Sequence, residues 1–367
     1  MRSTFEPLGK YVRLVDERNT DMVTESVLGI NIDKYFMPSV ANVIGTDLST
    51  YKLLRKGRFA CNPMHVGRDG RLPVARYEKD TPAIVSPAYF MFEVIDEREI
   101  APEYLMLCFR RPDFDRMCWF RTDASVRGGI TWEDVCALSI LVPPIDEQRK
   151  IVHDYQVVND RMSLLQKMNE KIETLLYADF QRKFQTGKEA TLKGTLLDGW
   201  QTGELSTLSE FQYGKMVPEE ERCETGYPIF SGYGITGYYP EYMFADSVIV
   251  VLARGVSGTG EVRISPKYSY ITNLSIALTL KDNAFFAYLY EYLAHDNLRA
   301  LDSGSAQSMI TIDSLNKYII AIPPKHLAEE YNNVFNKALE TIESNRNEID
   351  ILNKLLIFQV ESIAKGE

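Results

Sequence analysis

LVPPIDEQRKIV occupies residues 141–152, and AIPPKHLAEEYN occupies residues 321–332. Each stretch ends a short apolar run in Pro-Pro and then opens a long helical pattern, and the two copies lie 180 residues apart. The same offset relates Ile130-Thr131 to Ile310-Thr311, and Leu175-Leu176 to Leu355-Leu356. A solenoid usually needs three or more repeats. Two copies therefore predict a duplication into two halves of one body.

The residues after each Pro-Pro follow the spacing of a helix with one long apolar seam. The apolar positions alternate by four and three residues, which is typical of coiled coils. They are Ile151, Tyr155, Val158, Met162, Leu165, Ile172 and Leu176 in the first copy, and Tyr331, Phe335, Ala338, Ile342, Ile349, Leu352 and Leu356 in the second. Each helix should run for about 35–40 residues, or roughly 50–60 Å. We expect the two helices to pack against each other.

One polar residue interrupts each seam, Asn169 in the first helix and Asn345 in the second. An antiparallel pair would place these asparagines opposite each other, whereas a parallel pair would set each against an apolar residue. A buried asparagine pair can fix helix register. The alternative, that both lie at the hydrated edge of the seam, stays open.

Composition narrows the class of protein. The 367 residues are enough for two or three domains, and 45% of them are hydrophobic, which is ordinary for a globular protein. The sequence has neither an apolar run long enough to span a membrane nor an N-terminal secretory signal. The five cysteines form no CxxC pair and the four histidines are scattered, so we expect reduced thiols, a cytoplasmic location, and neither metal nor cofactor.

The chain divides into four predicted segments, and the predicted fold class is α+β. Residues 1–142 and 200–322 should form two mixed α/β domains, with strand-like runs, Gly-rich turns and helix candidates at residues 102–111 and 284–295. Residues 143–199 and 323–367 should form the two long helices, which pack as an antiparallel coiled coil with pseudo-twofold symmetry. Such a pair would hold the two domains at opposite ends of a rod.

This order of segments resembles the specificity subunit of type I restriction–modification systems over nearly the whole chain. The most specific marks are the Pro-Pro-x-x-Glu-Gln-x-x-Ile start of the first helix, the lead-in SVRGGITWED at residues 125–134, and GSAQSMI at residues 304–310. The second helix departs from the pattern, because PPKHLAEEY lacks the Glu-Gln pair.

The resemblance implies two domains that each read half of a split site in double-stranded DNA. It further implies that the helices dock two adenine-methyltransferase subunits, beside a motor–nuclease restriction subunit. We assign partner docking to Pro143, Pro144, Glu147 and Gln148.

Residues 52–76, called the basic stretch below, support the DNA interpretation. They carry Lys52, Arg55, Lys56, Arg58, Arg68, Arg71 and Arg76 against one acid, Asp69. Lysine and arginine contacts to phosphate supply most non-specific affinity for DNA. Glycines 57, 67 and 70 would let the backbone approach a groove, and Arg127 in the lead-in adds a further candidate. The alternative is a solvated basic loop.

The second domain is more acidic, with 8 basic and 14 acidic residues between 200 and 322. Its DNA-binding candidates are Tyr233, Arg254, Arg263 and Lys267. Because it holds fewer cations, we expect it to rely less on phosphate contacts than the first domain does.

Resemblances to enzyme motifs are incomplete. GVSGTG at residues 255–260 looks like a nucleotide loop, but a strand-like run follows it where a phosphate-binding loop must open a helix. SPAY and NPMH lack the second proline of an amino-methyltransferase motif. We therefore expect no catalytic residues. The competing hypotheses are a stand-alone DNA methyltransferase or nuclease, and a coiled-coil scaffold that binds only protein.

Overall fold

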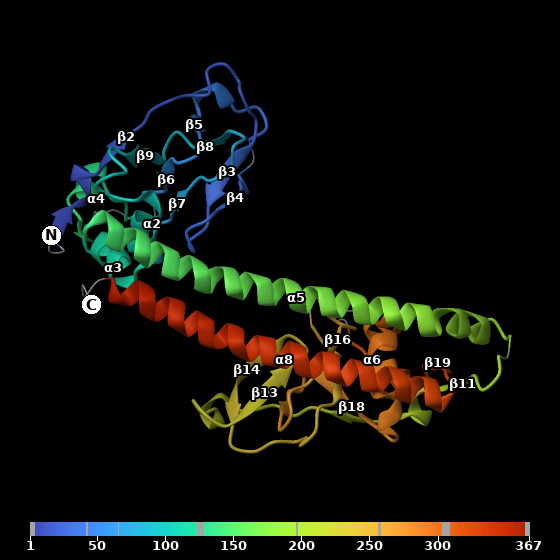
Figure 1. Cartoon of the computed structure of the whole chain (residues 1–367). Coiled ribbons are helices and arrows are strands. Elements are labelled where there is room, and N and C mark those ends of the chain that lie inside the picture. Colours follow the sequence, from blue (N-terminus) through green and yellow to red (C-terminus); the bar gives the residue numbers. More distant parts are fainter. Residues whose placement is uncertain are drawn as a thin grey trace. The chain divides into compact units, whose positions relative to one another are not determined.

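The computed structural model describes residues 4–41, 43–64, 66–122, 128–195, 197–255, 258–302 and 309–363. The chain forms two compact units (Figure 1). Unit 1 combines residues 1–165 with residues 347–367, and unit 2 comprises residues 166–346. The division falls within both long helices, α5 (Ile145–Leu192) and α8 (Lys325–Ser362), so each unit contains part of each helix. The four-segment boundaries remain a prediction.

The described residues of unit 1 form three small sheets and four short α-helices. Its strands pair in the orders β1-β10, β2-β9-β6-β7 and β4-β3-β8-β5. The strands are β1 (Thr4–Pro7), β2 (Val12–Leu14), β3 (Val27–Ile30), β4 (Phe36–Pro38), β5 (Lys52–Leu54), β6 (Phe59–Cys61), β7 (Val74–Arg76), β8 (Ala83–Val85), β9 (Phe90–Val94) and β10 (Ser139–Val142). The helices are α1 (Val66–Asp69), α2 (Pro102–Arg110), α3 (Pro112–Phe120) and α4 (Trp132–Cys136).

Unit 2 repeats this plan. Its strands pair in the orders β11-β19, β12-β18-β15-β16 and β14-β13-β17. They are β11 (Gln201–Glu204), β12 (Ser209–Tyr213), β13 (Tyr227–Ser231), β14 (Gly234–Tyr239), β15 (Ile249–Leu252), β16 (Val262–Ile264), β17 (Tyr270–Ile271), β18 (Ser275–Leu280) and β19 (Ile319–Ile322). Its short helices are α6 (Phe286–Ala294) and α7 (Ile312–Asn316). The two helices expected at residues 102–111 and 284–295 are thus α2 and α6.

The duplication extends to individual hydrogen bonds. The strand before each Pro-Pro, β10 or β19, pairs antiparallel with the first strand of its own unit. In unit 1 the hydroxyl of Tyr104 donates to the carbonyl of Leu141, and in unit 2 the hydroxyl of Tyr288 donates to that of Ala321. Each bond fastens a short helix to the strand that leads into a long one. The repeat seen in the sequence is therefore a repeat of tertiary structure.

The predicted seam positions of α5 and α8 are all buried or half-buried. Within unit 2, Tyr331 on α8 donates its hydroxyl to the carbonyl of Leu176 on α5, and Asn345 Nδ2 donates to Asn169 Oδ1 at 2.7 Å. The residue number rises along α8 as it falls along α5, so the two segments run antiparallel. Both asparagines are only 8% exposed. They face each other as the antiparallel register predicts, and their role in fixing that register remains a proposal.

Each unit has its own hydrophobic core. In unit 2, Phe180 and Phe184 of α5 and Tyr331 of α8 pack with Tyr288 of α6, with ring centroids 4.9–5.9 Å apart. Both long helices therefore supply core residues to unit 2 and are not surface additions to it. At about 25 cal/mol per Å² of apolar area, such aromatic burial is a major stabilising contribution.

Candidate nucleic-acid interface

The basic stretch runs through β5, β6, α1 and β7 of unit 1. Its backbone turns twice at Gly57 and Gly70, which adopt φ values of +89° and +66° and have open space beside them. These left-handed conformations suit glycine. Gly67 has a different role, because a Cβ there would lie 2.9 Å from the Cα of Gly128. The expectation that Gly67 frees the backbone to approach DNA is therefore wrong: this glycine allows two segments of unit 1 to touch.

The basic side chains of the stretch differ in exposure. Arg55, Lys56, Arg68 and Arg71 are exposed, whereas Arg58 and Arg76 keep only 15% and 17% of their side chains exposed.

Lys52 corrects the sequence-based assignment. Its side chain is only 11% exposed, and its Nζ donates to the carbonyl of Tyr89 at 2.6 Å. Burial lowers its pKa. Lys52 is buried because it lies on β5, a strand whose three residues are all buried and whose two faces are therefore both covered. It is not placed to contact DNA.

The other six cations of the basic stretch are all paired with carboxylates. Arg55 and Arg58 share Glu17, at 2.8 Å and 2.6 Å. The further pairs are Lys56 with Asp80, Arg68 with Asp69, Arg71 with Asp33, and Arg76 with both Glu103 and Glu78. The local positive charge is therefore largely balanced by acids from other segments, which the sequence window did not include.

This pairing leaves the four exposed cations able to bind phosphate. An exposed ion pair contributes only about 0–1 kcal/mol, so a DNA phosphate can replace the carboxylate at little cost. The hydrogen bond from Arg55 lowers the pKa of Glu17, which keeps that acid charged beside the arginine. Arg55, Lys56, Arg68 and Arg71 are accordingly the best phosphate candidates in the stretch. Arg127 lies outside the described residues.

In unit 2, Arg254 and Lys267 are exposed, and neither has an ion-pair partner within the described residues. Tyr233 occupies the turn between β13 and β14, and its ring packs where side chains at Gly255 and Gly258 would otherwise stand. Unit 2 thus has fewer cations than unit 1, but those at Arg254 and Lys267 are free. Both remain good candidates for DNA contact.

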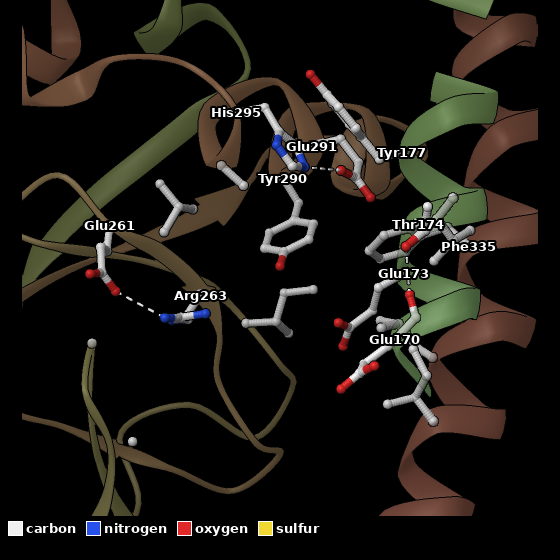
Figure 2. Close-up of a pocket in the computed structure, with 18 of the residues that line it drawn as sticks. Glu170, Glu173, Thr174, Tyr177, Glu261, Arg263, Tyr290, Glu291, His295 and Phe335 are labelled. Atoms are coloured by element: carbon white, nitrogen blue, oxygen red, sulfur yellow. Dashed lines mark hydrogen bonds and ion pairs between the residues drawn. The ribbon is translucent and has the colours of Figure 1, made fainter. Parts of the chain in front are cut away.

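Arg263 has a less suitable environment. It pairs with Glu261 at 2.9 Å and lines a cleft of about 880 Å³ within unit 2. Figure 2 shows Glu170 and Glu173 of α5 across the cleft from Arg263, with Glu291 of α6 and His295, the residue after α6, nearby. A phosphate backbone entering this acidic cleft would meet several carboxylates. Arg263 is the weakest of the predicted DNA contacts.

Glu291 is the most perturbed acid of the acidic cleft. It is 4% exposed, and burial raises its pKa to about 7. The hydroxyl of Tyr331 approaches one carboxyl oxygen at 3.4 Å, and Nε2 of His295 lies 3.1 Å from the other. The His295 ring stacks on Tyr177 of α5 with centroids 3.6 Å apart. This network joins α6 to both long helices inside unit 2. No group of three His, Cys, Asp or Glu side chains among the described residues is arranged to hold a metal ion.

The predicted docking residues at the start of α5 include one that faces inward. Gln148 is fully buried: its Oε1 accepts from the backbone N–H of Ala101, and its Nε2 donates to the carbonyls of Glu99 and Pro143. Its side chain cannot reach a partner, so the docking assignment for Gln148 is wrong. Pro143 is buried as well, while Pro144 is half-buried and Glu147 exposed.

Several exposed side chains escaped the sequence-based prediction. Trp119 and Phe120 end α3 at 47% and 78% exposure, and Arg299 is exposed in unit 2 without an ion-pair partner among the described residues. Tyr242 and Tyr268 contact each other on the surface of unit 2. In a sequence, apolar residues at the end of a helix are usually interpreted as core residues. Only the three-dimensional structure shows that Trp119 and Phe120 are on the surface.

Two general features complete the description. All five cysteines are free. Among the described helices, none combines the length and apolar character needed to cross a bilayer.

Comparison with known proteins finds one family model that matches part of the chain and solved structures with a similar fold. Residues 197–355 match the family model of the type I restriction modification DNA specificity domain. The fold is similar to that of the S subunit of a type I restriction-modification system from M. genitalium, with a TM-score of 0.65 and 15% identity, over 99% of this chain and 96% of that one.

A second similar structure comes from work on complex assembly and conformational transition of the type I R-M system. It has a TM-score of 0.50 and 16% identity, over 99% of this chain and 97% of that one. No curated protein matches the chain. Residues 197–355 are therefore similar to the type I restriction modification DNA specificity domain, and the whole chain is similar in fold to an S subunit.

Proposed function

We propose that this chain, a carrier of the type I restriction modification DNA specificity domain, is the specificity subunit of a type I restriction–modification complex. In this role it reads a bipartite, asymmetric site in double-stranded DNA. It positions two methyltransferase subunits and a motor–nuclease subunit, which carry out the chemistry, and it is itself non-catalytic and cytoplasmic.

The repeated plan of the two units is the observation that carries this proposal. Unit 2 contains most of the specificity domain, and unit 1 repeats its strand pairs, its short helix and its tyrosine–carbonyl bond. Two domains of one design supply two reading surfaces. Their side chains differ, with paired arginines in the first and a few free cations in the second, so the two half-sites should differ in sequence.

The Gly-rich loop supports a binding role over an enzymatic one. The segment that resembles a nucleotide loop leads into β16, which is a strand. A loop that cradles phosphate needs the N-terminus of a helix at this point. The described glycines of this segment, Gly255 and Gly258, lie against Tyr233, and the strand that follows gives no helix N-terminus to hold a methyl donor or nucleotide.

Exposed apolar side chains on the long helices support the docking of partner subunits. In unit 1, Val157 and Leu164 of α5 are 55% and 54% exposed, and Ile351 and Phe358 of α8 are 66% and 67% exposed. Both pairs are spaced by seven residues, so each pair lies on one helix face. Apolar stripes of this kind on a helix surface favour packing against a further helix. We therefore assign partner docking to these stripes and to the exposed Glu147, and no longer to the buried Gln148.

Mapping methylated adenines in cells that express this chain with its methyltransferase subunit tests the proposal. We expect methylation at one two-part sequence with a fixed spacer. Replacing residues 200–322 with the matching domain of another family member should change one half of that sequence and leave the other intact.

Three results would contradict the proposal: a single uninterrupted target, an unchanged target after the domain exchange, and methyl transfer by the purified chain alone. The last of these would instead establish a stand-alone methyltransferase.

A further inference from the structure

Trp119 and Phe120, called the aromatic wedge below, form an exposed pair at the C-terminal end of α3 in unit 1. Their ring centroids are 5.2 Å apart at an interplanar angle of 61°, an edge-to-face contact. Phe120 is 78% exposed, an unfavourable environment for so large an apolar side chain. Two adjacent exposed rings at a helix end are suited to a contact with another molecule.

The Trp119 side chain of the wedge is held in place before anything binds it. Trp119 Nε1 donates to the carbonyl of Gly67 at 3.1 Å, and the N–H of Gly67 donates to the carbonyl of Gly128 at 2.8 Å. The hydroxyl of Thr122 closes the end of α3 by donating to the carbonyl of Trp119 at 2.8 Å. Because the indole is already fixed, little side-chain entropy is lost when the wedge makes a contact.

Three arginines lie close to the wedge in the chain or beside its hydrogen-bond partner Gly67. Arg116 lies one helical turn before Phe120, on the same face of α3, and is exposed without an ion-pair partner among the described residues. Arg121 follows the wedge directly and pairs with Asp134 at a long 3.8 Å. Arg68 is 65% exposed next to Gly67. An exposed aromatic pair with arginines nearby in the chain matches the chemistry of DNA, whose bases stack and whose phosphates are anionic.

The matching position in unit 2 supports the same occupant. The N–H of Thr122 donates to the carbonyl of Trp119, and the N–H of Asp302 donates to that of Arg299, at the 180-residue offset. Arg299 and Ala300 thus replace Trp119 and Phe120. Unit 2 presents an exposed guanidinium where unit 1 presents aromatic rings, and both groups suit nucleic acid. At this position only unit 1 presents an aromatic ring.

We propose that the aromatic wedge inserts against, and partly unstacks, a base step in the half-site read by unit 1. Apolar side chains that enter a duplex in this way kink it and allow more protein surface to make contact. The inference rests on the proposed function and assigns the wedge to one half-site only. It predicts that DNA is distorted at the unit 1 half-site and not at the unit 2 half-site.

The test uses the full chain assembled with its methyltransferase subunits and a duplex carrying the target mapped by methylation. Phe120→Ala should weaken binding on the order of tenfold, as expected for the loss of one base-stacking side chain, without changing the salt dependence. Phe120→Tyr should retain wild-type affinity because it keeps the ring. Arg116→Ala should instead reduce the salt slope by about 1.

Phe5→Ala provides the matched control, because Phe5 is also exposed (61%) and lies on β1 of the same unit. It should leave affinity unchanged. A fluorescent adenine analogue placed in each half-site, away from the adenine that the methyltransferase flips out, should report unstacking only in the unit 1 half-site, and the signal should be lost with Phe120→Ala. Thermal melting of each variant verifies folding.

Wild-type affinity and fluorescence for Phe120→Ala would overturn the inference while leaving the proposed function intact. Weaker assembly with the methyltransferase, combined with normal DNA binding once assembled, would overturn it by showing that the wedge is a protein contact. Absence of sequence-specific binding by the wild-type complex would contradict the proposed function itself, and the wedge with it.

Discussion

The loop between β3 and β4 in unit 1 is anchored by an ion pair, whereas the matching turn between β13 and β14 in unit 2 is anchored by an aromatic ring. Lys34 Nζ donates to Asp115 Oδ1 of α3 at 2.7 Å and also to the carbonyl of Phe109, and its side chain is 5% exposed. Tyr233 instead packs over Gly255 and Gly258. Duplication has kept the strand pairing while the side chains that hold the loop have diverged.

A second comparison concerns the amide side chains near the start of each long helix. Gln148 of α5 accepts from the N–H of Ala101, the residue that caps α2. In unit 2 the residue at the 180-residue offset is Ala328, and Asn332, one turn later, accepts from the N–H of Ala287 in α6. Both amides supply an acceptor for a helix N-terminus that lacks one. In the second copy, which lacks the Glu-Gln pair, Asn332 therefore takes over the hydrogen bond to a short helix that Gln148 makes in unit 1.

The largest expected effect comes from breaking the buried ion pair of unit 1. Asp115→Ala leaves Lys34 buried without its carboxylate and also removes the acceptor for the N–H of Leu72. Removing one partner of a buried pair typically costs about 3–5 kcal/mol. Hydrogen exchange should show lower protection in unit 1 and unchanged protection in unit 2. Asp313→Ala, which breaks an exposed pair with Lys317 in unit 2, is the control and should have almost no effect.

Equal loss of hydrogen-exchange protection in both units after Asp115→Ala would show that the ion pair does not stabilise unit 1 alone. If Asp115→Ala lost no more protection than Asp313→Ala, the buried ion pair would contribute no more to stability than an exposed one.

The next effect depends on pH and concerns Glu291, which has no acidic counterpart in unit 1. Aligning Tyr288 with Tyr104 places Leu107 at the matching position. The pKa of Glu291 is raised by burial from 4.5 to about 7. Between these values the folded protein keeps a proton that the unfolded chain has released, so this group's stabilisation is lost as pH rises toward 7.

Glu291→Gln keeps the shape of the protonated acid and removes the titration. Its gain in unfolding free energy over wild type should grow from near zero at about pH 4.5 to on the order of 3 kcal/mol above pH 7. Burial lowers the pKa of His295, whose contribution has the opposite sign, so a His295→Gln background separates the two. Glu291→Leu, which imports the unit 1 residue, should also reduce the slope. A pH-independent difference between wild type and Glu291→Gln would contradict this assignment.

Removing the amide side chains of Gln148 and Asn332 should have smaller effects on stability, and the two effects should be unequal. Gln148→Ala removes three buried hydrogen bonds and leaves three backbone groups without partners, whereas Asn332→Ala removes one. Each buried group left unsatisfied costs about 1–3 kcal/mol, partly offset where water can enter. Chemical denaturation followed by hydrogen exchange should show that Gln148→Ala destabilises α2 more than Asn332→Ala destabilises α6. Equal losses would mean that the two amides are equivalent despite their different bonding.

These cases show which features the sequence can predict. The seam and the facing Asn169–Asn345 pair follow from spacing along a single helix and the 180-residue offset, so they were predictable. The Lys34–Asp115 pair joins residues 81 apart in sequence, and Gln148 bonds to a residue 47 positions away. No local pattern marks such contacts. The basic stretch shows the same limit, because acids such as Glu17 and Glu103 that balance it come from outside the window.

The smallest expected effect separates the two domains by their use of phosphate contacts. Arg55→Glu with Lys56→Glu replaces two exposed cations of unit 1 and should weaken DNA binding by the complex and flatten its salt dependence by about one unit per lost contact. In unit 2, Lys267→Glu should reduce the slope of this salt dependence by about one unit at most, because it removes at most one phosphate contact.

Binding is measured from about 50 to 200 mM salt on the mapped target. Lys317→Glu, which changes an exposed lysine on the surface of unit 2, is the charge-matched control. Equal salt slopes for the double variant and wild type would mean that the carboxylates Glu17 and Asp80 keep these cations from the phosphates. The first domain would then depend on base contacts as much as the second does.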